Sequence, residues 1–177
     1  MRKAIFLSLV FLMPSIALAQ VPTSGNVFFG YSYFNTNLSP IDRANANGWE
    51  ATLEGKFLPW VGIIADFDAH YGSQNFPLAP LGTFNADFAE HNYLFGPRVS
   101  VGVGKFRPFA EAMLGAGHVS GRAIGSDTSV ATGIGGGIDY RVLRLVGWRF
   151  QGNYIHTHLL GLAQSNLRLS TGIVIRF

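Results

Sequence analysis

The residues with the clearest potential for chemistry lie late in the chain, where His156-Thr157-His158 places two imidazoles two positions apart. Residues i and i+2 of a β-strand share one face, so both rings would point to the same side, a geometry that can hold a metal ion. Two ligands do not specify an ion, and a histidine pair at the end of a strand is more often an interfacial polar group. We therefore predict no metal site at these residues.

A second candidate is Gly133-Ile134-Gly135-Gly136-Gly137, which could suggest a phosphate-binding loop. Such a loop needs a strand before it and a helix N-terminus after it. Here Ile138, Tyr140 and Val142 continue the alternation of a strand. Glycines in that setting make room for large neighbours or allow the strand to bend. We predict neither nucleotide binding nor any other cofactor.

The composition favours strands over helices and indicates that water does not cover the whole surface. Apolar residues make up 48% of the 177 positions and charged residues only 13%, about half the share usual for a soluble domain. The 22 glycines and 14% aromatic residues favour strands and tight turns. The chain has no cysteine, which excludes a disulfide scaffold, thiolate zinc sites and cysteine nucleophiles.

The first nineteen residues have the pattern of a secretory signal peptide, with two basic residues, an apolar stretch and a small-x-small ending. An uncleaved membrane anchor is the alternative, but the 16 residues from Ala4 to Ala19 include Pro14 and fall short of the roughly 20 that a spanning helix needs. We predict a signal peptide over 1–19 and one mature domain over 20–177. The predicted cleavage site consists of Ala17, Ala19 and Gln20.

Cleavage would change the charge balance, because Arg2 and Lys3 are lost and 11 basic residues remain against 10 acidic ones. A net charge of about +1 leaves no footprint for nucleic acid. The mature chain also lacks an apolar run long enough for a spanning helix. Any crossing of a membrane must therefore use strands.

The mature chain divides into eight segments of alternating hydrophobicity, bounded by Gly, Pro, Asn or Ser clusters. An even number of strands lets a barrel close with both chain ends on one side. Long connections over 36–47, 72–90 and 119–128 alternate with short turns, as in outer-membrane barrels. The predicted strands are 25–35, 48–58, 61–71, 91–102, 108–118, 129–141, 147–158 and 165–177.

Parity separates the charges from the apolar side chains. In the second predicted strand Trp49 and Leu53 share one face, while Glu50 and Glu54 share the other. Across all strands the apolar face carries no charge, as a lipid-facing surface requires, because a cation at the bilayer midplane costs about 2–4 kcal/mol. The twelve charges predicted for the inward face are Glu50, Glu54, Lys56, Asp66, Asp68, Arg98, Glu111, Asp139, Arg141, Arg149, Arg168 and Arg176.

A soluble up-and-down barrel would show the same alternation with the apolar face inward. The low total charge, the aromatic residues near strand ends such as Trp60 and Trp148, and Phe177 in phase with the apolar face favour a membrane barrel. We predict an all-β fold, an eight-stranded antiparallel up-and-down transmembrane β-barrel. Mid-strand Ile134 should then face lipid, and Ser100 should face the lumen.

Several stretches resemble small outer-membrane β-barrels of the OmpA transmembrane-domain and OmpX kind, and the resemblance covers essentially Gly25 to Phe177. The resemblance implies the outer membrane of a Gram-negative-type bacterium, contact with outer-membrane lipid, and a monomer. It also implies recognition of Ile173, Ile175 and Phe177 by the barrel-assembly machinery. No peptidoglycan-binding domain follows Phe177, so cell-wall anchoring is not expected. The stretches are 94–98, 107–115, 135–140, 149–154 and 173–177.

The resemblance implies a non-enzymatic protein that contributes to envelope integrity and presents its loops at the surface, although no loop residue identifies a partner. A narrow channel for ions or small solutes is the alternative, because a charged lumen can be a selective pore. Equal numbers of acidic and basic side chains in a narrow interior favour a neutral plug.

A lipid-modifying enzyme is the third possibility, because outer-membrane lipid-A deacylases carry a serine, a histidine and an acid late in the chain. Here Thr157 stands between the histidines where a serine would be expected, and no acid follows Asp139. We therefore predict no enzyme.

Overall fold

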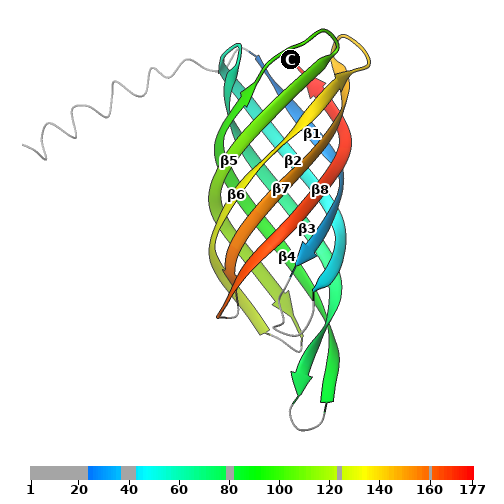
Figure 1. Ribbon diagram of the computed structural model, residues 1–177, viewed down its shortest axis with the longest axis vertical. Coiled ribbons are helices and arrows are strands. Elements are labelled where there is room, and N and C mark those ends of the chain that lie inside the picture. The colour runs from blue at the N-terminus through cyan, green and yellow to red at the C-terminus, as the bar shows by residue number, and fades with distance from the viewer. Residues whose placement is uncertain (1–23, 37–42, 79–81, 123–124, 160) are drawn as a thin grey trace, which may run out of the picture.

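The computed structural model describes residues 24–36, 43–78, 82–122, 125–159 and 161–177, and these residues form eight antiparallel strands closed into one barrel (Figure 1). The predicted fold class is confirmed. The predicted signal peptide and its cleavage site lie outside the described residues. No helix among the described residues is long and apolar enough to cross a membrane. The strands are β1 (Ser24–Thr36), β2 (Ala44–Leu58), β3 (Val61–Leu78), β4 (Gly82–Ser100), β5 (Phe106–Gly121), β6 (Gly125–Arg141), β7 (Val146–Leu159) and β8 (Leu162–Arg176).

Each strand pairs with its neighbours in the sequence, and β1 pairs with β8 to close the ring. The seam runs from Asn26 opposite Arg176 to Asn35 opposite Leu167. Because the barrel is closed, the backbone N–H and C=O groups of every strand in the wall find partners on both sides, as a strand in lipid requires. We call the end with the turns 59–60, 101–105 and 142–145 the terminal end, and the opposite end the loop end.

The strands extend much further towards the loop end than the sequence predicted. Of the segments predicted as long loops, the described parts of 72–90 and 119–128 are strand almost throughout, and strand also covers Thr36 and 44–47 of the segment 36–47. Asn45 and Asn47 signal turns in sequence, but in the structure the Tyr33 hydroxyl donates to Asn45 Oδ1 at 2.7 Å and the Tyr31 hydroxyl donates to Asn47. Cross-strand pairs of this kind stabilise a ladder beyond what propensity indicates.

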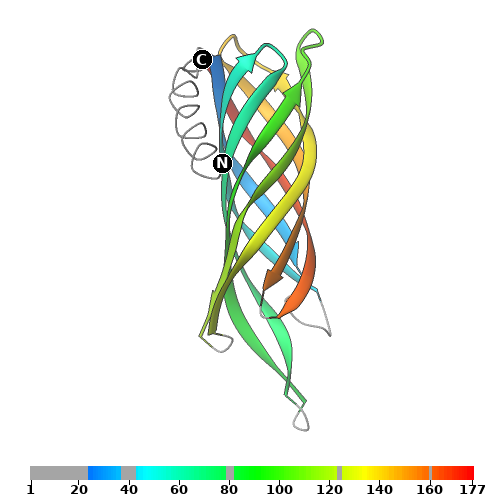
Figure 2. The same ribbon diagram turned by 90° about the vertical axis from the view of Figure 1, so that its left-hand side faces the viewer.

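The β3–β4 hairpin projects past the rest of the barrel at the loop end, as both views show (Figures 1 and 2). Its pairing continues from Ser73 opposite Asp87 to Leu78 opposite Gly82. The pairing of β3 with β2 stops at Gly72, and that of β4 with β5 stops at Ala89. Beyond these residues the hairpin is therefore a two-stranded ribbon to which no other described strand pairs.

The outward and inward faces follow the predicted parity. Ile134 is 64% exposed and Ser100 is 4% exposed, as their assignment to lipid and lumen requires. Aromatic side chains such as Trp60 and Trp148 lie on the outer surface at the terminal end. An apolar surface that continues around the whole barrel is far larger than the patches of soluble proteins, and it indicates a lipid environment.

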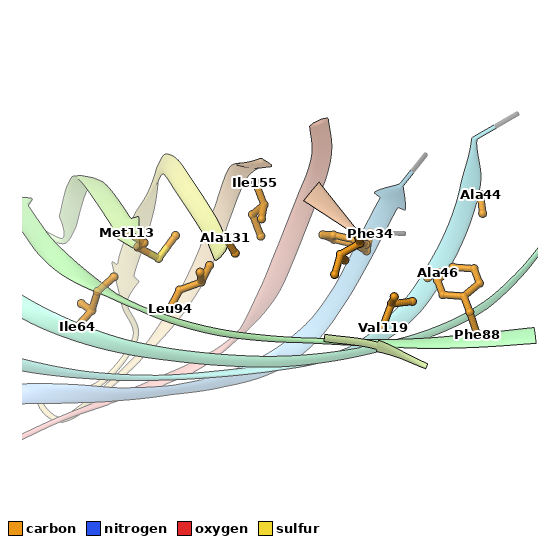
Figure 3. Close-up of a cluster of buried hydrophobic side chains, with 11 residues drawn as sticks. Phe34, Ala44, Ala46, Ile64, Phe88, Leu94, Met113, Val119, Ala131 and Ile155 are labelled. Carbon is orange, nitrogen blue, oxygen red and sulfur yellow. The ribbon is translucent and has the colours of Figure 1, made fainter. Parts of the chain in front are cut away.

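The inward face is not uniformly polar, which the prediction missed. Apolar side chains from every strand except β8 pack into one buried cluster (Figure 3). Ile64, Leu94 and Met113 would be read as lipid-facing by chemistry alone, but their position in the pleat directs them inward. The cluster consists of Phe34, Ala44, Ala46, Ile64, Phe88, Leu94, Met113, Val119, Ala131, Ile155 and Leu159.

Candidate functional site

The largest group of side chains with chemical potential lies inside the barrel, in two ionic clusters. In the cluster nearer the terminal end, Arg98 from β4 bridges two carboxylates. Its Nε donates to Glu111 Oε2 at 2.6 Å, and its Nη1 donates to Glu54 Oε2 at 3.3 Å. Lys56 Nζ lies 3.0 Å from Glu54 Oε1. Glu111 is therefore held by a cation from the neighbouring strand β4, whereas Glu54 is held by Lys56 of its own strand and by Arg98 from β4.

Arg149 from β7 completes the same cluster. Its Nε donates to Asp139 Oδ1 at 2.7 Å, and Arg176 Nη2 lies 3.5 Å from Asp139 Oδ2. The guanidinium carbons of Arg149 and Arg98 lie 4.7 and 4.4 Å from the centre of the Phe109 ring. Stacking of this kind is favourable for a desolvated cation.

The second cluster lies further towards the loop end, around Arg168 from β8. Arg168 Nη1 donates to Asp66 Oδ1 at 2.7 Å and to Asp68, and its Nε lies 3.4 Å from Glu50 Oε2. All four side chains are fully buried. One guanidinium therefore serves three carboxyl groups, so this part of the lumen holds more carboxyl groups than cations.

Two amide side chains connect the clusters. Gln151 Nε2 donates to Glu50, and Asn153 Nδ2 donates to Glu111 Oε1 at 2.5 Å. Opposite them, a Cβ on Gly135 would lie 2.4 Å from Asn153 Nδ2, and a Cβ on Gly137 would lie 2.7 Å from Gln151 Cβ. The interpretation of these glycines as room for large neighbours is thereby confirmed.

Two residues change the expected charge balance. Arg141 does not join the lumen network, because it is exposed at the rim of the terminal end, where its Nη2 donates to the Gly104 carbonyl at 3.2 Å. Glu90, placed in a loop by the sequence analysis, is fully buried inside the barrel opposite His70. The parity of β4 could have found it, since Glu90, Asn92 and Arg98 share one face.

The lumen therefore holds more carboxyl groups than the sequence predicted. The structure describes seven buried carboxyl groups there and five lysine or arginine side chains that form ion pairs with them, where the sequence predicted six of each. The carboxylates are Glu50, Glu54, Asp66, Asp68, Glu90, Glu111 and Asp139, and the cations are Lys56, Arg98, Arg149, Arg168 and Arg176. His70 adds a partner for one carboxylate, with Nδ1 lying 3.2 Å from Asp68 Oδ1.

The histidine pair does not form a metal site with its neighbours. His156 and His158 point outward near the loop end, and Thr157 points inward and donates to Gln164 Oε1 at 3.2 Å. The hydroxyl beside His156 is that of Ser165, with Oγ 3.3 Å from Nδ1, but no described carboxylate bonds to this histidine. Within the described part of the chain, no group of three or more histidine, aspartate or glutamate side chains could hold a metal ion.

The predicted assembly signal lies on the outer surface at the terminal end. Ile173, Ile175 and Phe177 are all exposed and in phase. Phe177 and Gly25 exchange two backbone hydrogen bonds of 3.0 and 3.1 Å, so the segment is also part of the closing seam.

At the loop end, a groove of about 600 Å³ lies beside the projecting hairpin. Its polar and aromatic lining includes Asn47, Tyr71, Ser73 and Asp87. The surface that faces away from the terminal end therefore combines hydrogen-bonding groups with exposed rings.

The comparisons with known proteins support the fold. No protein-family model matches the sequence, and a search of the curated proteins found no match. Among solved structures, Neisserial surface protein A is 15% identical with a TM-score of 0.70, over 86% of this chain and 97% of that chain. The fold is that of small outer-membrane β-barrel proteins. The resemblance seen in the sequence is thereby confirmed at the level of the fold.

Two further small barrels show the same likeness. Ail, the attachment invasion locus protein of Yersinia pestis, is 17% identical with a TM-score of 0.59, over 87% of this chain and 98% of that chain. The outer membrane protein OprG from Pseudomonas aeruginosa is 11% identical with a TM-score of 0.58, over 89% of this chain and 97% of that chain. The outer-membrane barrel fold thus extends over nearly the whole described chain.

Proposed function

We propose that the chain is a non-enzymatic outer-membrane barrel, closed along its axis, that contributes to envelope integrity and presents its loop end at the cell surface. The observation that carries the proposal is the filled lumen. Arg168 and Glu50 in the ionic cluster, and Leu94 and Val119 in the apolar cluster, have no accessible surface. A water-filled pore would expose such side chains.

The loop end supports surface presentation. The hairpin ribbon extends beyond the barrel wall, and the adjoining groove offers Tyr71 and amide groups beside apolar side chains such as Phe88. With short turns at the terminal end facing the periplasm, as in known barrels of this fold, the ribbon faces outward. A monomer surrounded by outer-membrane lipid, and assembled by machinery that reads Ile173, Ile175 and Phe177, fits this arrangement.

Non-enzymatic function is supported by the surroundings of the outward histidines. Acyl transfer needs a nucleophile, a base and a group that orients the base. His156 contacts the Ser165 hydroxyl, but among the described residues no acid orients the ring. The pair therefore lacks the third component of such a site.

Planar-bilayer recording on the refolded protein tests the closed lumen. We expect no steady conductance from the wild type at neutral pH. A stable, ion-selective current that is abolished by substitution at Glu111 or Arg149 would instead establish a channel. Because these residues lie fully inside the ionic cluster, their substitution separates flux through the lumen from leakage around the protein.

A further inference from the structure

Basic side chains outnumber carboxylates at the terminal end, although Lys56 and Arg176 each form one ion pair there. A cavity of about 220 Å³ opens there, lined by Lys56 from β2, Arg107 from β5 and Arg176 from β8, together with Ser24 and Asn26 from β1. A smaller cavity next to it shares two of these arginines and adds Lys105 and Arg141. Among the described residues, no aspartate or glutamate side chain lines either cavity, although Phe177, which bears the α-carboxylate of the given sequence, lines the larger one.

The nearest carboxylates are already engaged. Glu54 is held by Arg98 and Lys56, and Asp139 is held by Arg149 at 2.7 Å and more weakly by Arg176 at 3.5 Å. The Arg176 Nε is buried and has no hydrogen-bond partner. A buried donor without a partner is unfavourable, so the pairing with Asp139 leaves the Arg176 guanidinium incompletely satisfied.

Arg107 is the cation with the least compensation. It lies opposite Asp139 in the β5–β6 register, yet no described carboxylate is within ion-pair distance of its guanidinium. The side chain instead lies near Gly102, where a Cβ would be 3.6 Å from Nη2. It also lies close enough to Lys56 for the two charges to repel each other. An anion between them would turn this repulsion into attraction.

We propose that this cavity at the terminal end binds a phosphate group. Three cations from three different strands converge on it, which suits a tetrahedral dianion, whereas a single carboxylate needs only one guanidinium. The Ser24 hydroxyl adds a further donor. The volume equals that of about seven water molecules, so a phosphate with its ester carbon fits. This site is independent of the proposed surface role, because it opens at the opposite end of the barrel.

Inorganic phosphate is the probe, and the protein is refolded in a maltoside detergent, which carries no phosphate. We expect saturable binding by calorimetry, weakened about tenfold by Arg107→Gln, the loss of one charge-assisted hydrogen bond. Arg144→Gln is the matched control, because Arg144 lies in a turn at the same end but does not line the cavity. Its affinity for phosphate should equal that of the wild type.

Gel mobility of unboiled samples first shows that each variant is folded. If Arg107→Gln does not refold, Arg107→Lys is compared with Arg144→Lys, and only the former should weaken binding, because it loses the planar fork. Equal weakening at positions 107 and 144 would show general charge screening and overturn the proposal. Absence of saturable phosphate binding by the wild type would overturn it as well.

Nanodiscs then identify the source of the phosphate. If a soluble ligand occupies the site, inorganic phosphate binds equally well in discs of phosphatidylcholine alone and in discs that also contain phosphatidylglycerol. If a headgroup of the adjoining leaflet occupies it, phosphatidylglycerol lowers the apparent affinity for phosphate several-fold in the wild type but not in Arg107→Gln. Both results support a phosphate site and differ only in the source of the phosphate group.

Discussion

Replacement of Arg168 by Met tests whether the second ionic cluster, the one nearer the loop end, depends on its single guanidinium. The substitution keeps much of the side-chain volume but leaves Asp66, Asp68 and Glu50 without the cation that contacts all three. Removal of one partner from a buried ion pair costs about 3–5 kcal/mol, because the remaining charge is uncompensated. With three carboxylates affected and every side chain fully buried, we expect a loss at the upper end of that range.

The free energy of unfolding is measured by urea titration in lipid vesicles, with tryptophan fluorescence and unboiled gel mobility as independent readouts. The deficit should be largest at neutral pH and should shrink as the pH falls towards about 4, since protonation removes the repulsion among the carboxylates. Arg122→Met at the exposed loop end is the control and should match the wild type. A deficit of Arg168→Met below about 1 kcal/mol, or one that does not change with pH, would refute the reasoning.

Three further predictions follow from the facing, the packing and the seam. Ile134→Arg should cost about 2–4 kcal/mol in vesicle folding assays. Equal tolerance of Ser100→Arg would contradict the assignment of faces. Gly135→Ala should destabilise by about 1–3 kcal/mol, because its Cβ would lie 2.4 Å from Asn153 Nδ2 and from the Gly152 carbonyl. Gly152→Ala meets only Leu169 Cδ2 at 3.2 Å and Arg168 O at 3.9 Å, so a urea titration should show a much smaller loss. Deletion of Phe177 should lower the heat-modifiable fraction in cell envelopes, and an unchanged fraction would argue against its role in assembly.

The number of strands and the facing of their side chains could be predicted because every strand of a lipid-facing wall must alternate, with its charged side chains on the inward face. Glu50, Glu54 and Leu53 had to fall on opposite sides of β2 in any membrane barrel, so one error of register would have placed carboxylates in lipid. Ile173, Ile175 and Phe177, which carry part of the resemblance, follow the same alternation. These parts of the fold follow from local chemistry.

The loop end could not be predicted in the same way. Asn45 and Asn47 are typical turn residues, and only the tyrosines opposite them, from another strand, make them part of a ladder. Glu90 was missed because the predicted strand began at residue 91, whereas β4 begins at Gly82. Leu94 packs against side chains from other strands, and alternation along one strand does not reveal what lies across a lumen. The omissions at Asn45, Asn47 and Leu94 concern contacts between strands, whereas Glu90 could have been found from the parity of β4.

The seam between β1 and β8 also determines when the barrel can form. Asn26 and Arg176 are about 150 residues apart in sequence, yet they are direct partners in the ring. Contacts of such high sequence separation form slowly, because the loop-closure entropy is lost before the pairing is gained. Until they form, β1 and β8 each present an unpaired edge that could pair with another chain. An exported chain must therefore be protected from aggregation until its two end strands have paired.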